Sequence, residues 1–249
     1  MDASVYKHLY DELDHMHGWD FSKLQVISEG VKWELYEEVI KRCERSDILL
    51  DVGTGGGEHI IQIASSFLFL VGIDISSDMV QAAQTNLRKS KVSNIRFSEM
   101  TAEDLQFPTG FFDVITCRQA PFNAKEIAKV LKKGGSFFTQ QVCEADKLNL
   151  KIAFGRGQQF GVCDGALKEK AIEDLKEAGF TCIQSFEYDA TEYYQRPEDL
   201  LFLLKHTPII PDFGKDPKDF DILNHFIYKN RTERGIPTNS KRFMLTATF

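Results

Sequence analysis

The fold is decided by the stretch Ile48-Leu49-Leu50-Asp51-Val52-Gly53-Thr54-Gly55-Gly56-Gly57, which is followed directly by Glu58-His59-Ile60-Ile61-Gln62-Ile63-Ala64. The first residues are apolar and predict a buried strand, and the spacing of the isoleucines after the glycines predicts a helix. Glycines have no Cβ, so the backbone between the two can turn sharply and a ligand can lie directly against it. A strand, a glycine turn and a helix in this order predict a nucleotide-binding site.

Two acidic residues beside the turn indicate which class of ligand it holds. Glu58 stands in the first turn of the helix, where the pyrophosphate of a dinucleotide would have to approach, and so it disfavours phosphate. Asp51 ends a buried strand, where a carboxylate is costly unless it meets a cation or hydrogen-bond donors. Both residues favour S-adenosylmethionine, which has no phosphate and carries a sulfonium and an ammonium group. A helix-capping or loop-bracing role is the alternative for Asp51.

Asp74 ends the next predicted strand, Phe69–Asp74. A carboxylate at this place can accept hydrogen bonds from both ribose hydroxyls of a bound nucleoside. It fits a dinucleotide as well as S-adenosylmethionine, so it predicts a nucleoside without choosing between them. Capping of the following helix is the alternative, although Ser76 and Ser77 can already serve as caps.

Strand and helix patterns alternate after the glycine turn, which is typical of a parallel sheet covered on both faces. The predicted strands are Asp47–Val52, Phe69–Asp74, Asn94–Glu99, Phe112–Cys117, Ser136–Val142, Phe180–Tyr188 and Lys241–Phe249. The predicted helices are Gly30–Arg45, Glu58–Ala64, Ser77–Lys89, Ala124–Leu131, Leu167–Ala178 and two stretches near Pro197–Lys205 and Pro217–Lys229. Glu144–Gly161 is predicted to be an irregular insertion.

We expect one domain over residues 1–249, divided into four segments. These are a helical N-terminal arm (1–46), a cofactor-binding core (47–188), a lid (189–240) and a last strand (241–249). The lid is predicted because about fifty residues between two neighbouring strands are too many for a plain loop.

Composition narrows the class of protein. The net charge of −7 and the lack of a basic block argue mildly against a nucleic-acid polymer as partner without excluding one. The five cysteines are scattered without metal-ligand spacing, so we expect reduced thiols and no metal site. No signal-peptide pattern is present, and the most apolar stretch, Phe67–Ile73, is too short to span a bilayer. We therefore expect a soluble cytoplasmic protein.

Five motifs in register resemble the class I S-adenosylmethionine-dependent methyltransferases over roughly Asp47–Val142. They are the glycine motif Asp51–Gly57, the acid Asp74, and the stretches Thr101–Pro108, Phe111–Arg118 and Val130–Phe137. The resemblance implies a Rossmann-like, doubly wound α/β sheet of about seven strands, mostly parallel with the last strand antiparallel.

The same resemblance implies which residues bind the cofactor S-adenosylmethionine. The expected set is Asp51, Gly53, Thr54, Gly55, Gly57, Asp74, Ile75, Thr101, Ala102, Glu103 and Arg118. The chain departs from the family at Thr101, where an aspartate is usual. Contact with the adenine amine is therefore expected to be weaker or to come from elsewhere.

Methyl transfer is a direct displacement at an activated carbon, so few obligatory catalytic residues are expected. Gln119, Asn123, Gln140 and Gln141 lie where the fourth and fifth strands end, the edge at which open α/β sheets bind ligands. They are candidates for orienting the acceptor, with loop scaffolding as the alternative. Cys117 lacks the preceding proline of a covalent nucleophile and is expected to pack.

The predicted function is methyl transfer from S-adenosylmethionine to a small molecule, with an RNA or protein acceptor as the first alternative. An NAD-dependent oxidoreductase, disfavoured by Asp51 and Glu58, and a non-catalytic nucleoside-binding module are the alternatives from other classes. The histidines His8, His15 and His17 are expected on a solvated face rather than at a metal. Trp19 and Phe21 are candidates for a flap over the cofactor. The sequence predicts no oligomeric state.

Overall fold

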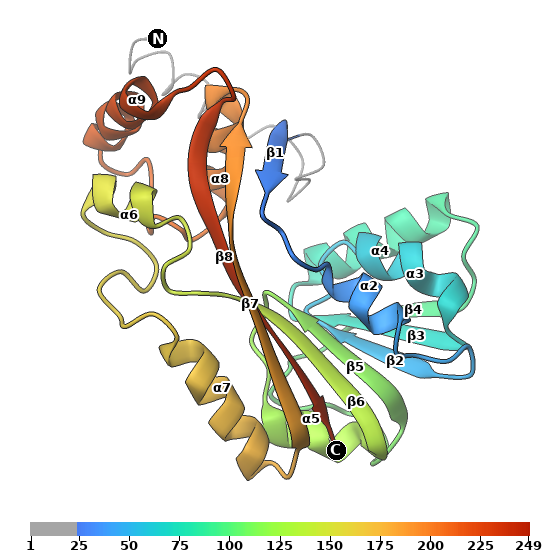
Figure 1. The fold of residues 1–249 in the computed structure, drawn as a ribbon. Coiled ribbons are helices and arrows are strands. Elements are labelled where there is room, and N and C mark those ends of the chain that lie inside the picture. Colours follow the sequence, from blue (N-terminus) through green and yellow to red (C-terminus); the bar gives the residue numbers. More distant parts are fainter. Residues whose placement is uncertain (1–23) are drawn as a thin grey trace. The chain divides into compact units, whose positions relative to one another are not determined.

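The strands predicted around the glycine turn pair with one another in parallel. In a computed structural model, which describes residues 24–249, Asp51 of β2 (Ile48–Val52) lies opposite Gly72 of β3 (Phe69–Asp74). On its other side Asp51 lies opposite Thr116 of β5 (Phe112–Arg118) (Figure 1). The glycine turn therefore leaves the sheet between two parallel neighbours.

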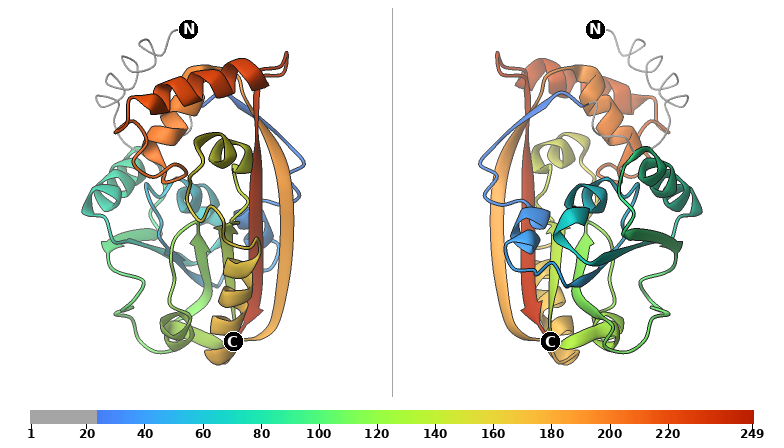
Figure 2. Two further views of the ribbon diagram at one scale, coloured as in Figure 1. Left: turned by 90° about the vertical axis from the view of Figure 1, so that its left-hand side faces the viewer. Right: turned by 90° about the vertical axis from the view of Figure 1, so that its right-hand side faces the viewer.

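The chain divides into two units, each described by itself. The larger unit combines Lys32–Val142, Leu167–Glu187 and Arg242–Phe249. The smaller unit combines residues 24–31 with Cys143–Ala166 and Tyr188–Lys241. Strands β7 (Thr181–Tyr194) and β8 (Ile236–Thr248) are long enough to run through both (Figure 2).

The sheet of the larger unit has the strand order β7-β8-β6-β5-β2-β3-β4. β4 (Ile95–Glu99) is parallel to β3, and β6 (Leu131–Val142) is parallel to β5. β8 is antiparallel to β6, with Ser136 opposite Thr248. The carboxyl ends of β2 to β6 therefore meet at one edge, because parallel strands share their direction.

Helices cover this sheet because each has one apolar side. α2 (Leu35–Ile40), α3 (Glu58–Ile63) and the short turn η3 (Ala64–Ser66) pack on the face that carries Leu49 and Phe138. α4 (Ser77–Lys89) follows β3 and begins at Ser76, whose hydroxyl accepts a hydrogen bond from the Met79 N–H at 3.4 Å.

The other face of the larger unit carries an aromatic group. The rings of Phe122 and Phe180 lie 5.1 and 6.0 Å from the ring of Phe137. α5 (Ala124–Val130) and α7 (Ala166–Glu177) are the remaining helices of this part of the chain, and α5 buries Ile127.

The smaller unit has its own apolar core, formed by leucines, isoleucines and phenylalanines. Three helices contribute to it, namely α6 (Leu148–Phe154), α8 (Pro197–His206) and α9 (Lys218–Asn230). β1 (Val26–Glu29) pairs antiparallel with the end of β7. Buried Lys147 donates a hydrogen bond to Glu192 at 2.7 Å and lies over the ring of Tyr194.

The mixed α/β sheet confirms the predicted fold class, with three corrections. Residues 24–249 hold eight strands rather than about seven, because β1 lies in the segment predicted as a helical arm. A helix, α6, lies in Glu144–Gly161, where Lys147 and Gly155 both adopt left-handed backbone and confine it to seven residues. β7 and β8 extend beyond their predicted bounds, because pairing continues into the smaller unit.

Disulfide bonds, membrane-spanning helices and clusters of metal ligands can be checked in the described part of the chain. None of the five cysteines, all of which are described, forms a disulfide. Among the helices of residues 24–249, none has the length and apolar character needed to cross a membrane. In the same part of the chain, no three His, Cys, Asp or Glu side chains group as metal ligands. His8, His15, His17, Trp19 and Phe21 lie outside the described residues.

Candidate functional site

The predicted site residues gather at the carboxyl edge of the parallel strands. Asp51 lies near the end of β2 and Asp74 ends β3, while Arg118 ends β5. Gln140 lies near the end of β6 and is the register partner of Arg118. Open α/β sheets bind ligands at this edge, at the point where the strand order reverses. In this sheet the order reverses at β2, with β3 on one side and β5 on the other.

The glycine turn has the backbone that only glycine adopts easily. Gly53, Gly55 and Gly57 have φ of 72°, 55° and 73°, in the left-handed region. A Cβ on Gly53 would lie 2.3 Å from Cβ of Ala120, so a side chain there would clash. No heavy atom lies within 4 Å of a Cβ built on Gly55. The turn is therefore packed on one side and open at Gly55.

Asp51 is buried beneath this turn, with 2% of its surface exposed. Its Oδ1 accepts hydrogen bonds from Thr116 Oγ1 at 2.6 Å and from the Tyr36 hydroxyl at 3.1 Å. Burial raises the pKa of Asp51 to about 6, although the hydrogen bonds from Thr116 and Tyr36 and the charge of Arg118 oppose the rise. The carboxylate would thus be stabilised by a cation at neutral pH.

Asp74 braces the turn from the neighbouring strand. Its Oδ2 accepts a hydrogen bond from the Gly55 N–H at 3.0 Å, and its Oδ1 accepts one from the Ser76 N–H at 2.9 Å. Each carboxylate oxygen keeps a second lone pair for a ligand hydroxyl. Ile75, the next residue, has 74% of its surface exposed, which is unusual for an isoleucine beside a buried strand.

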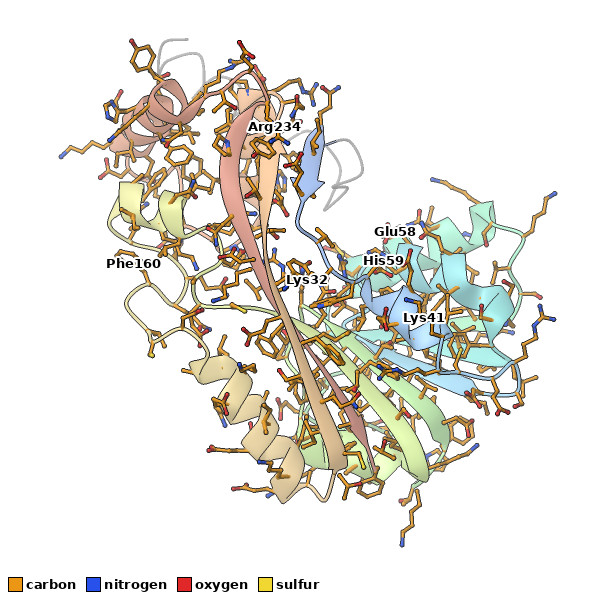
Figure 3. All side chains as sticks on the ribbon, in the orientation of Figure 1. Lys32, Lys41, Glu58, His59, Phe160 and Arg234 are labelled. Atoms are coloured by element: carbon orange, nitrogen blue, oxygen red, sulfur yellow. The ribbon has the colours of Figure 1, made fainter. Side chains whose placement is uncertain are left out.

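Arg118 contacts His59, and His59 in turn stacks on Tyr36; the sequence singled out neither aromatic residue. Its Nη1 lies 2.9 Å from Nε2 of His59, and the His59 ring stacks on that of Tyr36 at 5.1 Å. Burial and the charge of Arg118 lower the pKa of His59 to about 4. His59 is therefore neutral at pH 7, and Nε2 accepts, because a guanidinium has only donors. Figure 3 labels His59 beside Glu58 in the first turn of α3.

The loop after β4 contacts the start of α5. Thr101 Oγ1 accepts a hydrogen bond from the Glu103 N–H at 3.2 Å. Glu103 in turn accepts one from Asn123 Nδ2 at 2.9 Å, while Asn123 Oδ1 caps α5. The neighbouring Ala102 is half-buried. Asn123 therefore has structural bonds, and its predicted part in orienting an acceptor stays a prediction.

The glutamines at this edge have different surroundings. Gln141 Nε2 donates to the Ala120 carbonyl at 2.9 Å and to Thr139 Oγ1 at 2.8 Å, which braces the loop after β5. Gln119 is exposed and has a left-handed backbone with φ of 54°. Burial and the charge of Asp51 raise the pKa of the Cys117 thiol to about 12, so Cys117 is neutral. This agrees with its expected packing role.

Three residues of the site were missed by the sequence analysis, namely Tyr36, His59 and Thr116. Tyr36 and His59 lie on helices α2 and α3, which are predicted from the spacing of their apolar residues. That spacing assigns no role to the hydroxyl of Tyr36 or to the imidazole of His59. Thr116 alternates with apolar residues in a strand, which is a weak signal for a partner of Asp51.

A cavity of about 280 Å³ between α2 and α3 is lined by Tyr36, His59 and two acidic residues, Glu34 and Glu37, among others.

Comparison with known proteins identifies the family. Residues 44–190, more than half of the chain, match the family model described as "Methyltransferase domain". The chain is 34% identical over 120 residues to a Bacillus subtilis (strain 168) protein named "Uncharacterized methyltransferase YcgJ". That match covers 45% of this chain and 47% of the relative.

A second relative, the demethylmenaquinone methyltransferase of Lactococcus lactis subsp. lactis (strain IL1403), is 32% identical over 131 residues. The match covers 47% of this chain and 51% of the relative. The chain thus spans about half the length of the curated relatives it matches.

The crystal structure of the YcgJ protein from Bacillus subtilis has the same fold, with a TM-score of 0.62 at 21% identity. The superposition covers 85% of this chain and 96% of that structure. The glycine turn, the two acids beside it and the matched family model lead to one assignment. The chain belongs to the class I S-adenosylmethionine-dependent methyltransferases.

Proposed function

We propose that this protein transfers the methyl group of S-adenosylmethionine to a small-molecule acceptor. The observation that carries the proposal is the position of two acids, Asp51 and Asp74, at the open glycine turn. Asp74 accepts a hydrogen bond from the Gly55 N–H at 3.0 Å, and the hydrogen bonds to buried Asp51 come from the hydroxyl groups of Tyr36 and Thr116. An amino-acid nucleoside needs two kinds of partner. Its ribose hydroxyls need hydrogen-bond acceptors, and its ammonium group needs an anion.

The residues present fit this cofactor. The space above Gly55 admits a ligand against the backbone, because no heavy atom lies within 4 Å of a Cβ built there. Asp74 would hold the ribose, and Asp51 would hold the ammonium directly or through water. Exposed Ile75 offers an apolar surface for a flat base, with the loop of Thr101, Ala102 and Glu103 on the next strand. Gly53, Thr54, Gly57 and Arg118 complete the proposed set.

When bound, the cofactor supplies a methyl carbon whose bond to the sulfonium sulfur breaks as the bond to the acceptor forms. The chain's own residues then have to orient the acceptor and exclude water. Gln119 is the proposed orienting residue, because its exposed amide stands on a strained backbone directly after β5. Gln140, Gln141 and Asn123 support the same edge. No charged general base is required for an acceptor that arrives deprotonated.

The proposal of a small acceptor rests on charge and on the relatives. A net charge of −7 does not favour a polyanionic RNA acceptor. One relative is named for a small substrate, demethylmenaquinone. An RNA or protein acceptor is the alternative. We also propose that the protein acts in the cytoplasm, since none of its five cysteines is disulfide-bonded.

We further propose that the smaller unit, with the predicted lid 189–240, contributes to acceptor choice. It holds a cavity of about 410 Å³ within it, lined by apolar Leu148 and Ile152 and by polar Asp189 and Asn239, among others. Exchange of Ile152 for Glu should change the acceptor preference in a panel of small molecules. The affinity for S-adenosylhomocysteine should stay the same.

Thermal shift measurements on the full chain test the proposed function. S-adenosylhomocysteine at about 100 times its Kd should stabilise the protein by about 2.7 kcal/mol, whereas NAD should not. 5′-Methylthioadenosine, which keeps the nucleoside and lacks the amino acid, should give a smaller shift. Stabilisation by NAD alone would indicate an oxidoreductase and would contradict the proposal. Binding of S-adenosylhomocysteine without turnover of any acceptor would favour a nucleoside-binding module.

A further inference from the structure

We propose that the cavity of the smaller unit binds the methyl acceptor through two features of that molecule, an apolar part and a cationic amine. The inference rests on the proposed function, in which this unit contributes to acceptor choice, and it names the class of acceptor. The cavity has a volume of about 410 Å³, which is in the range of cavities that hold small organic ligands. Its lining comes from α6, β7 and β8, all within the smaller unit.

The apolar side of the cavity is formed by α6. Leu148 and Ile152 are four residues apart and therefore lie on one face of this helix. They are 39% and 62% exposed, whereas Leu150 and Phe154 on the opposite side are buried in the core of the unit. The core is complete without Leu148 and Ile152, so their apolar surface is open to a ligand.

The polar side of the cavity is formed by alternate residues of β7. Side chains of a strand alternate between its two faces, so Asp189 and Thr191 share one face. Ala190 and Tyr194 point to the other face, where both are buried. Asp189 and Thr191 therefore point away from the core and line the cavity.

The amide donors at the cavity hold its wall together. Asn239 Nδ2 donates one hydrogen bond to the Ala145 carbonyl at 2.7 Å and one to Asp189 Oδ1 at 3.0 Å. Both N–H groups of this amide are thus bonded within the protein. Asn149 Nδ2 donates to the Pro237 carbonyl at 2.9 Å. These bonds leave few donors for an anionic ligand.

The groups that remain for a ligand are acceptors. Asp189 Oδ1 accepts the bond from Asn239, while Asp189 Oδ2 and the Thr191 hydroxyl have no hydrogen bond within residues 24–249. No lysine, arginine or histidine is among the described residues that line the cavity. A carboxylate and a hydroxyl without a cation in the lining favour an ammonium group and disfavour an anion.

Two lysines close to this region are paired with other acids. Lys241 forms an ion pair with Asp164. The pKa of Lys241 is raised chiefly by its hydrogen bond to Asp164 and less by the charge of Asp189. Buried Lys147 is bonded to Glu192 at 2.7 Å. The charge of Asp189 is therefore available to a cation of the ligand.

The amine is the point of attachment and not the methylated atom. An ammonium group has no lone pair, so it cannot displace the sulfonium sulfur of S-adenosylmethionine. The methyl group therefore goes to another nucleophilic atom of the same molecule, while the apolar part contacts Leu148 and Ile152. Fatty acids and phosphorylated compounds are disfavoured as acceptors, since Asp189 repels their charge.

Chemical-shift titrations of the full chain saturated with S-adenosylhomocysteine test the proposal. The probes are 4-phenylbutylamine, 4-phenylbutanol and 4-phenylbutyrate, which share an apolar part and end in a cation, a neutral group and an anion. We expect the amine to bind about 5-fold more tightly than the alcohol and the acid to bind most weakly. The backbone amide signals of Thr191 and Asn239 should move with the amine.

Two variants separate the charge from the apolar surface. Asp189→Asn removes the charge and keeps an acceptor for Asn239, so the amine and the alcohol should bind equally. Ile152→Ser should weaken all three probes alike, by about 3-fold, and keep the preference for the amine. Asp221→Asn and Val162→Ser are matched controls at exposed positions outside the lining, and they should behave as the wild type.

A salt titration of the wild type tests the charge without a substitution. Raising sodium chloride from about 0.05 M to about 0.5 M should weaken binding of the amine, because salt screens exposed charges. Binding of the alcohol should stay almost unchanged. Equal salt dependence of the two probes would contradict the role of Asp189.

The outcomes are distinct. Tighter binding of the acid than of the amine, or a preference for the amine that persists in Asp189→Asn, overturns the proposed acceptor class. So does an absence of binding by all three probes, or binding that moves only signals from residues outside the cavity. Failure of S-adenosylhomocysteine to move the amide signal of Gly55 in the wild type would instead contradict the proposed function.

Discussion

The hydroxyl of Tyr36 donates a hydrogen bond to Oδ1 of Asp51 across 3.1 Å and so joins helix α2 to the end of strand β2. Tyr36 keeps its proton, because burial and the charge of Asp51 raise the pKa of its hydroxyl. It is therefore a donor at neutral pH. The bond holds a carboxylate in place where burial alone would favour the protonated acid.

The first prediction concerns the pH dependence of stability. The pKa of Asp51 is about 6 in the folded protein and about 3.9 in an unfolded chain. The folded state thus binds more protons between these values, and the contribution of Asp51 to the free energy of unfolding falls as pH rises from about 4 to 6. Asp51→Asn should gain stability relative to the wild type over this window, on the order of 2 kcal/mol.

Urea unfolding of both proteins at pH 4.5, 6 and 7.5 checks this. A difference in unfolding free energy that does not vary with pH would show that Asp51 titrates alike in the folded and unfolded chains.

The second prediction concerns Tyr36→Phe. This change removes the donor to Asp51 and keeps the ring that stacks on His59. Since the hydrogen bond from Tyr36 lowers the pKa of Asp51, its loss should move that pKa upward from about 6. A carbon-detected NMR titration of the Asp51 carboxyl measures the midpoint. A midpoint that stays in place or moves downward would contradict the role assigned to the hydroxyl.

The third prediction concerns Asp74. Asp74→Ala removes the acceptors for the Gly55 and Ser76 N–H groups and the proposed acceptors for the ribose. The affinity for S-adenosylhomocysteine should fall by about 10-fold or more, since bonds to a charged group contribute about 1.5–3 kcal/mol each. Calorimetric titration gives the ratio, with exposed Asp78→Ala as control. Equal affinities would place the ribose elsewhere.

The fourth prediction separates backbone strain from steric clash in the glycine turn. Gly57 has φ of 73°, and a Cβ there would lie 2.4 Å from the Phe97 ring. Gly134 has φ of 81°, and no heavy atom lies within 4 Å of a Cβ built on it. Both Gly57→Ala and Gly134→Ala should lose about 1–2 kcal/mol through φ, and Gly57→Ala about 1–3 kcal/mol more through overpacking.

Equilibrium unfolding of the two variants gives both values. Equal losses would mean that the ring of Phe97 moves aside without penalty.

The fifth prediction concerns the buried ion pair of the smaller unit. The Lys147 side chain is 2% exposed and bonded to Glu192 at 2.7 Å. Lys147→Met should destabilise the protein by about 3–5 kcal/mol, because Glu192 loses its bonded cation. The double variant Lys147→Met/Glu192→Leu should recover much of this loss. A double-mutant cycle measures the coupling; additive losses would show that Lys147 contributes by packing alone.

Much of the larger unit is determined by sequence. β3 and α4 begin and end where the patterns place them, because Phe69–Ile73 is an apolar run ended by Asp74 and Ser76 supplies a cap. The glycines, Asp51 and Asp74 were identifiable as a site, since a strand, a tight turn and a helix leave one place for a nucleoside. Each of these features is formed by residues that are close together in the sequence, so the sequence alone is enough to predict it.

Only the tertiary structure decided the rest. β1 is a strand because β7 pairs with it, and nothing within Val26–Glu29 required that partner. The linkage of Arg118 to His59, Tyr36 and Asp51 joins residues from α2, α3, β2 and β5 that are far apart in sequence. The sequence by itself determined a glycine turn between two acids. The packing of α2 and α3 over the sheet decided that one acid is buried beneath a tyrosine and that a neutral histidine holds an arginine beside it.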